Sequence, residues 1–225
     1  MNRMLPAGAL ALALIGGGAW YVTQGSGAAN VSQAPLPGAA QAQQAADVDT
    51  SGITEMTLGD AEAPVEVIEY ASFTCPHCAT FHTEVFKDLK EDYVDTGKVS
   101  FTYREVYFDK YGMWASLIAR CAGEDRFFGI VDLIYKGQST WSRAGSDAAI
   151  ADELRKIGRL AGMENDQIDA CLTDGDKLQT LVAWYQQNAT EHGIQSTPSF
   201  VIDGETYSNM SYADFSAILD ERLGE

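Results

Sequence analysis

Two cysteines separated by two residues, in Cys75-Pro76-His77-Cys78, are the residues of this chain best suited to chemistry. On a helix this spacing puts two thiols one turn apart, which allows them to form and break a disulfide. Such a pair has three interpretations: a redox-active dithiol, half of a zinc site, or a structural pair. A zinc site needs two more ligands, and the remaining cysteines and histidines form no paired ligand spacing. The pattern therefore favours thiol–disulfide chemistry.

The segments around this motif predict a strand before it and a helix after it. Residues 65–70 are mostly branched and aromatic, Phe81, Phe86 and Leu89 recur at helical spacing, and Gly97 closes the segment. The dithiol then lies at a helix N-terminus, where unpaired backbone N–H groups and the helix dipole favour negative charge. We therefore expect a stabilised Cys75 thiolate, which makes Cys75 a good leaving group and its disulfide oxidising.

The composition indicates a folded and acidic protein. Hydrophobic residues make up 46% of the 225 residues, enough for one globular domain or a domain with an insertion. Thirty-two acidic and fifteen basic residues give a formal net charge of -17, which repels phosphate backbones. We expect no nucleic-acid partner and interpret the charge as a solubilising surface.

The N-terminal segment predicts export from the cytoplasm. An uncharged run extends from Leu5 to about Val22, followed by small residues that permit cleavage. Residues 1–29 are therefore either a signal peptide that is removed or a membrane anchor that is retained. Residues 30–50, rich in Ala and Gln, are expected to form a flexible linker. Both alternatives place the folded part outside the cytoplasm, with membrane contact only through a possible N-terminal anchor.

The first half of the folded part has the pattern of a βαβ unit. Strands are expected at 53–58, 65–70 and 99–103, and the helix after Cys75 joins the last two. A crossover helix of this kind implies parallel pairing with a right-handed connection.

The second half reads as a block of helices followed by two strands and a helix. From about 109 to 192 apolar residues recur every three or four positions. Glycines stand at the expected helix ends, namely Gly137, Gly145, Gly162, Gly175 and Gly193. Strands at 199–202 and 205–207 flank an Asp203-Gly204 turn, and a helix capped by Ser211 runs to Leu223. The fold class is therefore α/β.

Two stretches of the sequence resemble one family. The run Glu69-Tyr70-Ala71-Ser72-Phe73-Thr74-Cys75-Pro76-His77-Cys78 and the later Gly193-Ile194-Gln195-Ser196-Thr197-Pro198-Ser199-Phe200 are similar to DsbA-like thiol:disulfide oxidoreductases. The resemblance implies a thioredoxin-like fold, a central mixed sheet flanked by helices, with an inserted all-helical domain. It divides the chain into a first thioredoxin-like part at 51–108 with the CxxC motif, a helical insertion at 109–178, and a second part at 179–225 with the cis-proline loop.

The resemblance also implies roles for the two cysteines and for the Thr197-Pro198 loop. Cys75 is expected to be the exposed nucleophile and Cys78 the buried partner that closes the disulfide. Pro198 is expected to be a cis-proline facing the dithiol, with Thr197 pairing edge-on with a substrate strand. The alternative for Pro198 is an ordinary trans loop proline.

Two further residues near the dithiol are candidates for supporting roles. His77, inside the loop, is expected to add a hydrogen bond or partial positive charge to the Cys75 thiolate, or else to be simply exposed to solvent. Glu69 resembles the acid that this family buries beneath the dithiol, where it relays protons. Its alternative is an outward-facing strand residue.

The function implied is the introduction of disulfides into exported proteins by dithiol–disulfide exchange. The expected partners are unfolded or folding exported proteins with free thiols, and a quinone-linked membrane oxidase resembling DsbB that restores the disulfide. Beyond the Cys75–Cys78 disulfide itself, no organic cofactor and no metal is expected. The alternatives are a reductase or isomerase and, in a different class, a non-catalytic binding module or holdase for exported polypeptides.

Cys121 and Cys171 are the remaining cysteines, both in the helical block. In an exported chain two such cysteines are expected to form a structural disulfide, because Cys75 and Cys78 leave them as the only complement. Two buried thiols and a second redox pair are the alternatives.

Overall fold

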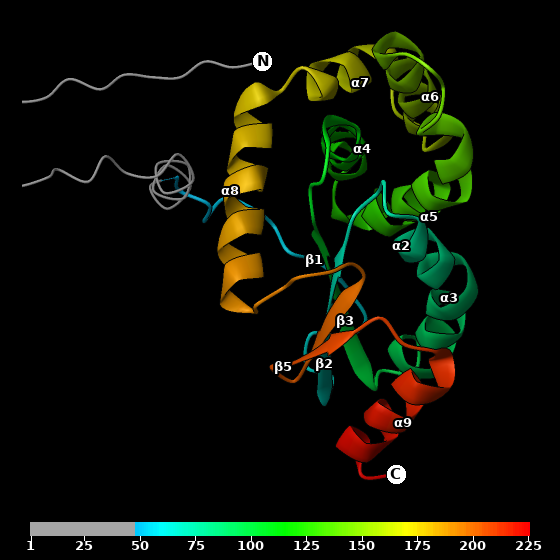
Figure 1. Cartoon of the computed structure of the whole chain (residues 1–225), viewed down its shortest axis with the longest axis vertical. Coiled ribbons are helices and arrows are strands. Elements are labelled where there is room, and N and C mark those ends of the chain that lie inside the picture. The colour runs from blue at the N-terminus through cyan, green and yellow to red at the C-terminus, as the bar shows by residue number, and fades with distance from the viewer. Residues whose placement is uncertain (1–47) are drawn as a thin grey trace, which may run out of the picture. The chain divides into compact units, whose positions relative to one another are not determined.

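Strand β2 (Val65–Ala71) lies in the middle of a mixed sheet, and all of its residues except Glu66 are buried. The computed structural model describes residues 48–225. The described sheet has five strands in the order β1 (Met56–Leu58), β3 (Val99–Glu105), β2, β4 (Ser199–Ile202) and β5 (Glu205–Ser208). β2 pairs with β3 in parallel, whereas the other three pairings are antiparallel. The predicted α/β class and mixed sheet are confirmed (Figure 1).

The crossover from β2 to β3 is a helical run that changes its winding twice. It comprises α2 (Pro76–Thr80), the π-helical η1 (Phe81–Val85), α3 (Phe86–Leu89) and the π-helical η2 (Lys90–Val94). Its apolar side chains pack against the sheet together with Phe200 and Phe215. The helix predicted after Cys75 is therefore present, and the two π-helical turns within it were not predicted.

Strand β1 is shorter than the predicted strand at 53–58. Only Met56, Thr57 and Leu58 pair with β3. Ile53 packs instead against a cluster of Tyr107, Leu117 and Leu181 away from the sheet ladder. The predicted strand is therefore confirmed for residues 56–58, whereas tertiary packing keeps residues 53–55 out of the sheet.

Two helical layers cover the two faces of the sheet (Figure 1). On one face α8 (Gly175–Glu191) packs against Ile68, Tyr70 and Val201. The other face holds the crossover helices and α9 (Tyr212–Leu223). The Ser211 side chain accepts a hydrogen bond from the N–H of Asp214, which confirms the predicted cap.

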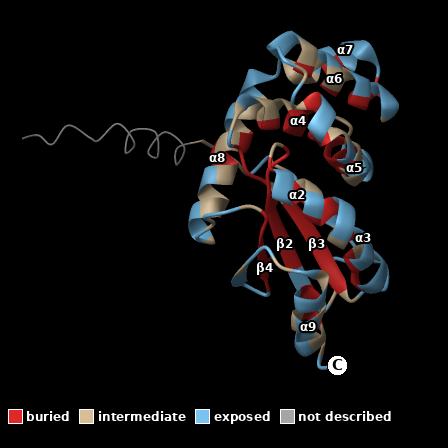
Figure 2. Ribbon diagram, turned by 45° about the vertical axis from the view of Figure 1, so that its right-hand side comes forward, coloured by how far each residue is buried: buried red, intermediate tan, exposed pale blue. Residues whose placement is uncertain are grey.

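The four helices between β3 and α8 gather at the end of the sheet where β2 and β3 finish (Figure 2). They are α4 (Lys110–Cys121), α5 (Glu124–Trp141), α6 (Asp147–Leu160) and α7 (Asn165–Leu172). Their buried side chains belong to the same apolar core as Phe73, Cys75 and Cys78. The dithiol therefore lies where the sheet and the inserted helices meet.

The predicted helix end at Gly137 is wrong. Gly137 lies inside α5, which continues to Trp141 because Gln138 and Trp141 bury side chains on the helix face that meets the core. Gly145, Gly162 and Gly193 adopt positive φ after the ends of α5, α6 and α8, as expected. Gly175 is the first residue of α8.

The predicted boundary between the helical insertion and the second thioredoxin-like part, at 178/179, falls inside α8. The first half of α8 packs through Leu181 on Leu117 of α4, and its second half packs through Tyr185 and Ala189 on the sheet. The predicted segments 1–29 and, for all but three residues, 30–50 lie outside the described residues. Within residues 48–225, no helix is long and apolar enough to cross a membrane.

Candidate active site

Cys75 occupies the N-cap position of α2, directly after the turn that follows β2. Its backbone is extended, with φ -80° and ψ 119°, and Pro76 begins the helix. Proline suits this position because it has no N–H to leave unpaired and its φ is already helical. The backbone N–H groups of His77 and Cys78 are thereby free to point at Cys75 Sγ. The predicted placement of the dithiol at a helix N-terminus is confirmed.

The surroundings of Cys75 favour its thiolate. A hydrogen bond from the Cys78 thiol is the largest contribution, followed by hydrogen bonds from Thr197 and from the backbone N–H groups of Cys78 and His77. Together they outweigh the opposing effect of burial and lower the pKa of Cys75 from 9.0 to about 5. Cys75 is therefore an anion at neutral pH in the reduced protein.

Cys78 behaves in the opposite way. Its side chain is completely buried, and burial raises the pKa of its thiol far above the ordinary value, with the hydrogen bond to Cys75 and the nearby Glu69 acting in the same direction. Cys75 is itself buried, with 7% of its surface exposed, so the expectation of an exposed nucleophile is wrong for this structure, although Cys75 keeps more surface than Cys78. The two thiols are chemically distinct: one is ionised, and the other is fully enclosed and protonated.

Glu69 lies in the middle of β2 with no exposed surface, opposite Tyr103 of β3 and Phe200 of β4. Neither carboxylate oxygen has a hydrogen-bond partner in the described part of the chain. The pKa of Glu69 is raised to about 8, mainly by burial and secondly by the negative charge of Cys75. Glu69 is therefore an inward-facing carboxylic acid that carries its proton at neutral pH, and the alternative of an outward-facing residue is wrong.

The loop before β4 closes over the dithiol. The Thr197–Pro198 peptide bond is cis, as expected, and Pro198 is buried. The carbonyl oxygen of Thr197 lies 3.5 Å from Cys75 Sγ, which donates to it when protonated. Two segments separated by 122 residues in the sequence therefore meet at one sulfur atom.

The chain is similar to known proteins both in sequence and in fold. The thioredoxin family model matches residues 51–221. A Rickettsia bellii protein described as a candidate protein-disulfide oxidoreductase is 33% identical over 192 residues, which cover 82% of this chain and 73% of that protein. The crystal structure of Wolbachia pipientis alpha-DsbA1 matches with a TM-score of 0.71 at 26% identity, covering 76% of this chain and 92% of that chain. The chain belongs to the DsbA-like disulfide oxidoreductases of the thioredoxin family.

Other relatives of the DsbA-like family extend this comparison. Disulfide bond formation protein D of Bacillus subtilis is 25% identical over 171 residues, covering 72% of each chain. A Rickettsia felis relative is 33% identical over 172 residues, and the chain spans 61% of its length. The DsbA-like fold and the protein-disulfide oxidoreductase activity follow from this membership, whereas substrates and partners are taken up as proposals below.

His77 lies on the exposed first turn of α2 in this DsbA-like site. Its backbone N–H contributes to holding the Cys75 thiolate, as described above. The imidazole faces solvent, which matches the alternative of simple exposure, and its proposed assistance to the thiolate stays a prediction.

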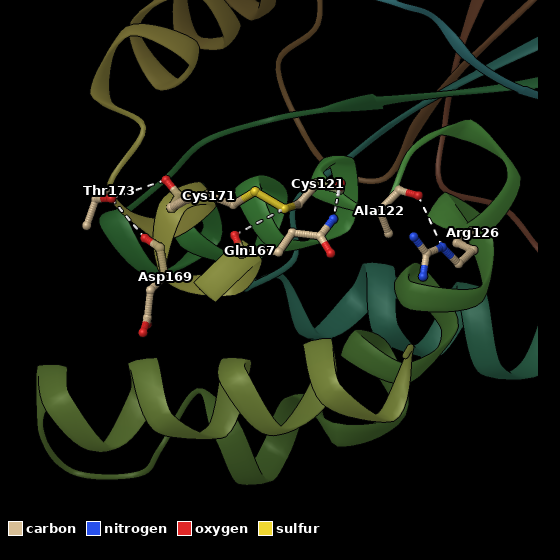
Figure 3. Close-up of a disulfide and its surroundings, with 8 residues drawn as sticks. Cys121, Ala122, Arg126, Gln167, Asp169, Cys171 and Thr173 are labelled. Atoms are coloured by element: carbon tan, nitrogen blue, oxygen red, sulfur yellow. Dashed lines mark hydrogen bonds between the residues drawn. A yellow bond between two sulfur atoms is a disulfide. The ribbon is translucent and has the colours of Figure 1, made fainter. Parts of the chain in front are cut away.

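Cys121 and Cys171 form a disulfide between the last residue of α4 and α7 (Figure 3). Their Cα atoms are 6.0 Å apart. The interpretation of these residues as buried free thiols is therefore wrong. Among residues 48–225 the only two cysteines without a disulfide are Cys75 and Cys78.

Sequence reasoning missed three residues that surround the dithiol. Tyr103, Tyr135 and Gln138 are buried and come from β3 and α5. Tyr135 and Gln138 carry a weak signal, because they are polar residues at i and i+3 on the apolar face of a predicted helix. Nothing in the sequence pairs that face with the CxxC motif. In the described residues no group of three His, Cys, Asp or Glu lies together as a metal site.

Proposed function

We propose that this DsbA-like protein is an exported thiol oxidase that transfers its Cys75–Cys78 disulfide to the thiols of proteins folding in the periplasm. The observation that supports the oxidising direction best is the contrast between the two thiols. A Cys75 thiol with a pKa of about 5 favours the reduced, ionised form of the enzyme, so its disulfide readily accepts electrons.

Oxidation of a client proceeds by two exchange steps. A client thiolate attacks Cys75 Sγ, a client–Cys75 disulfide forms, and the Cys75–Cys78 bond breaks with its electron pair on Cys78. Cys78 takes up a proton, because its enclosed thiolate is strongly disfavoured. A second client thiolate then attacks the client sulfur and expels the Cys75 thiolate. Two electrons have passed to the enzyme, and the client leaves with its disulfide.

Glu69 is the proposed source of the proton that Cys78 needs. Its carboxyl group is buried, has no hydrogen-bond partner among the described residues, and raises the pKa of the nearby Cys78 when it is charged. With a pKa of about 8 Glu69 holds a proton at neutral pH and can donate it to Cys78. Because burial disfavours the carboxylate that remains, Glu69 readily takes up a proton again. We assign Glu69 the role of proton relay to the buried sulfur.

Clients are proposed to dock on the loop that contains Thr197 and Pro198. The backbone of Thr197 already approaches Cys75 Sγ, so an extended client segment pairing with that backbone places its cysteine beside the same sulfur. Restoring the disulfide after each cycle requires a separate oxidant, for which we propose a quinone-linked membrane oxidase resembling DsbB. Residues 1–29 deliver the protein to the periplasm as a cleaved signal or hold it there as an anchor.

The direction of transfer is tested by equilibrating the full-length protein with defined ratios of reduced and oxidised glutathione. An oxidase is expected to stay largely reduced at ratios that oxidise thioredoxin, whose potential is about -270 mV. A potential near that of thioredoxin would exclude net oxidation and leave the reductase or isomerase assignment.

The catalytic assignment is tested with a reduced, unfolded two-disulfide client. The wild-type protein is expected to oxidise it stoichiometrically and Cys75→Ser to have no activity. Cys78→Ser is first converted with oxidised glutathione to its Cys75–glutathione disulfide; a client thiolate is then expected to attack Cys75 Sγ, expel glutathione and form a client–Cys75 mixed disulfide. A holdase predicts instead that Cys75→Ser keeps the client soluble as well as the wild type does and that no mixed disulfide forms.

A further inference from the structure

Helix α5 directs two buried hydrogen-bond donors at the backbone that leads into Cys75. The Tyr135 hydroxyl donates to the carbonyl oxygen of Ser72 over 3.2 Å. The Gln138 side-chain amide donates to the carbonyl oxygens of Phe73 and Cys75, over 2.8 Å and 2.9 Å. Tyr135 and Gln138 are three residues apart and therefore on one face of α5, so a single helix contacts three carbonyl groups within four residues.

These carbonyl groups lie in the turn between β2 and α2, where the local backbone supplies a donor to two of the three. The Ser72 carbonyl accepts from Cys75 N–H over 3.0 Å, and the Cys75 carbonyl accepts from Ala79 N–H over 3.2 Å. Helix α5 adds a second bond to each of these and supplies the bond from Gln138 to the Phe73 carbonyl. A buried carbonyl that loses its partner costs about 1–3 kcal/mol, so the Phe73 carbonyl in particular depends on Gln138.

Both donors are themselves held in place. Tyr135 has one hydroxyl hydrogen, and Ser72 O can only accept, so in the 2.6 Å contact between Tyr103 and Tyr135 it is Tyr103 that donates. The Phe73 ring packs on both tyrosines, with ring centroids 5.5 Å apart in each case. Gln138 is 8% exposed and Tyr135 2% exposed, so water does not replace either contact readily.

We propose that Tyr135 and Gln138 are positioning residues through which the inserted helices set how oxidising the Cys75–Cys78 disulfide is. They hold the backbone before α2 so that Cys75 Sγ stays in front of the first N–H groups of that helix. The contact matters more in the reduced protein, because only a thiolate depends on those N–H groups for its stability. The oxidised form, in which Cys75 is bonded to Cys78, is held by the covalent bond instead.

The deciding variant is Gln138→Met, which keeps the length and burial of the side chain and removes both donated hydrogen bonds. Gln167→Met is the control for loss of an amide donor, because the Gln167 amide also donates to a cysteine carbonyl, that of Cys121, over 3.2 Å, but on the exposed surface beside the Cys121–Cys171 disulfide (Figure 3). Both full-length variants are equilibrated with glutathione, and the Cys75 thiolate is titrated by its ultraviolet absorbance.

Gln138→Met is expected to raise the pKa of Cys75 by about one unit and to move the glutathione equilibrium about tenfold toward the oxidised protein, a shift of roughly 30 mV for a two-electron couple. Gln167→Met is expected to leave both quantities at the wild-type values. If Gln138→Met lowers only the melting temperature and keeps the wild-type pKa and potential, its role is structural and the proposal is overturned.

Tyr135→Phe keeps the proposal testable should Gln138→Met fail to fold, because it removes a single oxygen atom from a packed ring. It breaks the bond to Ser72 O and is expected to move the same equilibrium by about threefold in the same direction. A wild-type equilibrium in Tyr135→Phe, or a shift toward the reduced protein, would overturn the positioning role.

Discussion

Two glutamates on neighbouring strands are equally buried and have opposite surroundings. Glu69 of β2 is fully enclosed and has no hydrogen-bond partner among the described residues. Glu105 of β3 is 1% exposed, and both its oxygens receive hydrogen bonds from Arg120 over 2.6 Å, with a third from Ser116 over 2.9 Å. The first carboxyl group lies beneath the dithiol, and the second ties β3 to α4.

The difference shows how one sheet keeps one buried carboxyl group neutral and another charged. An ion pair offsets the cost of burying Glu105 as an anion, because a guanidinium group matches both carboxylate oxygens. Glu69 is given no cation, so burial makes its ionised form unfavourable and its proton available. Glu105 is therefore suited to stabilising the fold, whereas Glu69 has the surroundings that the proposed proton relay requires.

The largest expected effect is that of Arg120→Met. The substitution leaves Glu105 buried and unpaired, which costs about 3–5 kcal/mol of unfolding free energy. Urea unfolding of the oxidised protein measures the loss, and the client-oxidation rate of the folded variant is expected to stay near that of the wild type.

Arg155→Met is the control for this prediction, because Arg155 pairs with Asp152 and Asp169 on the partly exposed surface of α6 and α7. It is expected to cost less than about 1 kcal/mol. Equal losses in the two arginine variants would mean that burial does not distinguish the two ion pairs.

Glu69→Gln is expected to have the opposite effect on stability. In the oxidised protein the Cys75 charge is absent, but burial, the larger cause, still holds the folded-state pKa of Glu69 above its ordinary value of 4.5. The wild-type unfolding free energy therefore falls as pH rises from this ordinary value through the folded-state pKa, by at most roughly 1.4 kcal/mol per pH unit. Glu69→Gln removes this slope, so the variant is more stable than the wild type at neutral pH and equal to it near about pH 4.

The same variant is expected to oxidise clients more slowly, because Cys78 loses its proton source. Urea unfolding at several pH values gives the slope, and the rate of mixed-disulfide formation gives the activity. A variant with wild-type pH dependence of stability would show that Glu69 is solvated in the folded protein and contradict its assignment as a buried acid.

The smallest expected effect is that of Ser116→Ala. Ser116 donates to Glu105 and accepts from the Tyr107 hydroxyl over 2.9 Å. Removing this hydroxyl leaves the Arg120 contacts intact and is expected to cost about 1 kcal/mol, since a neutral donor contributes less than a charged one. A loss as large as that of Arg120→Met would show that Ser116, and not the arginine, keeps Glu105 charged.

The dithiol and its helix could be predicted from the sequence because their signals are local. The thiol spacing, the proline at the first helical position and the apolar period after it lie within one continuous segment. The cis-proline loop and Glu69 were reached through a family resemblance, which supplies the long-range contacts that periodicity lacks. The capped α9 and the hairpin turn at Asp203 followed from standard turn and cap chemistry.

The contacts that cross the fold could not be predicted. Gln138 contacts Phe73, which is 65 positions away in the sequence, and Arg120 of α4 contacts Glu105 of β3. The apolar periodicity of a helix shows which face is buried but not which element packs against that face. Gly137 was taken for a helix end because glycine has a low helix propensity, and packing on both sides of it kept α5 continuous. Tertiary packing decided each of these positions.

Helix α8 determines where the helical insertion can be exchanged between relatives. Its first half is anchored on α4 and its second half on the sheet, so one rigid rod belongs to both cores. A swap of the helical insertion between relatives that joins the chains within this helix would separate the two anchoring halves. Recombination points at Asp109 and at Gly193, outside the rod, keep each hybrid's helix whole and are the natural places to exchange the insertion as a unit.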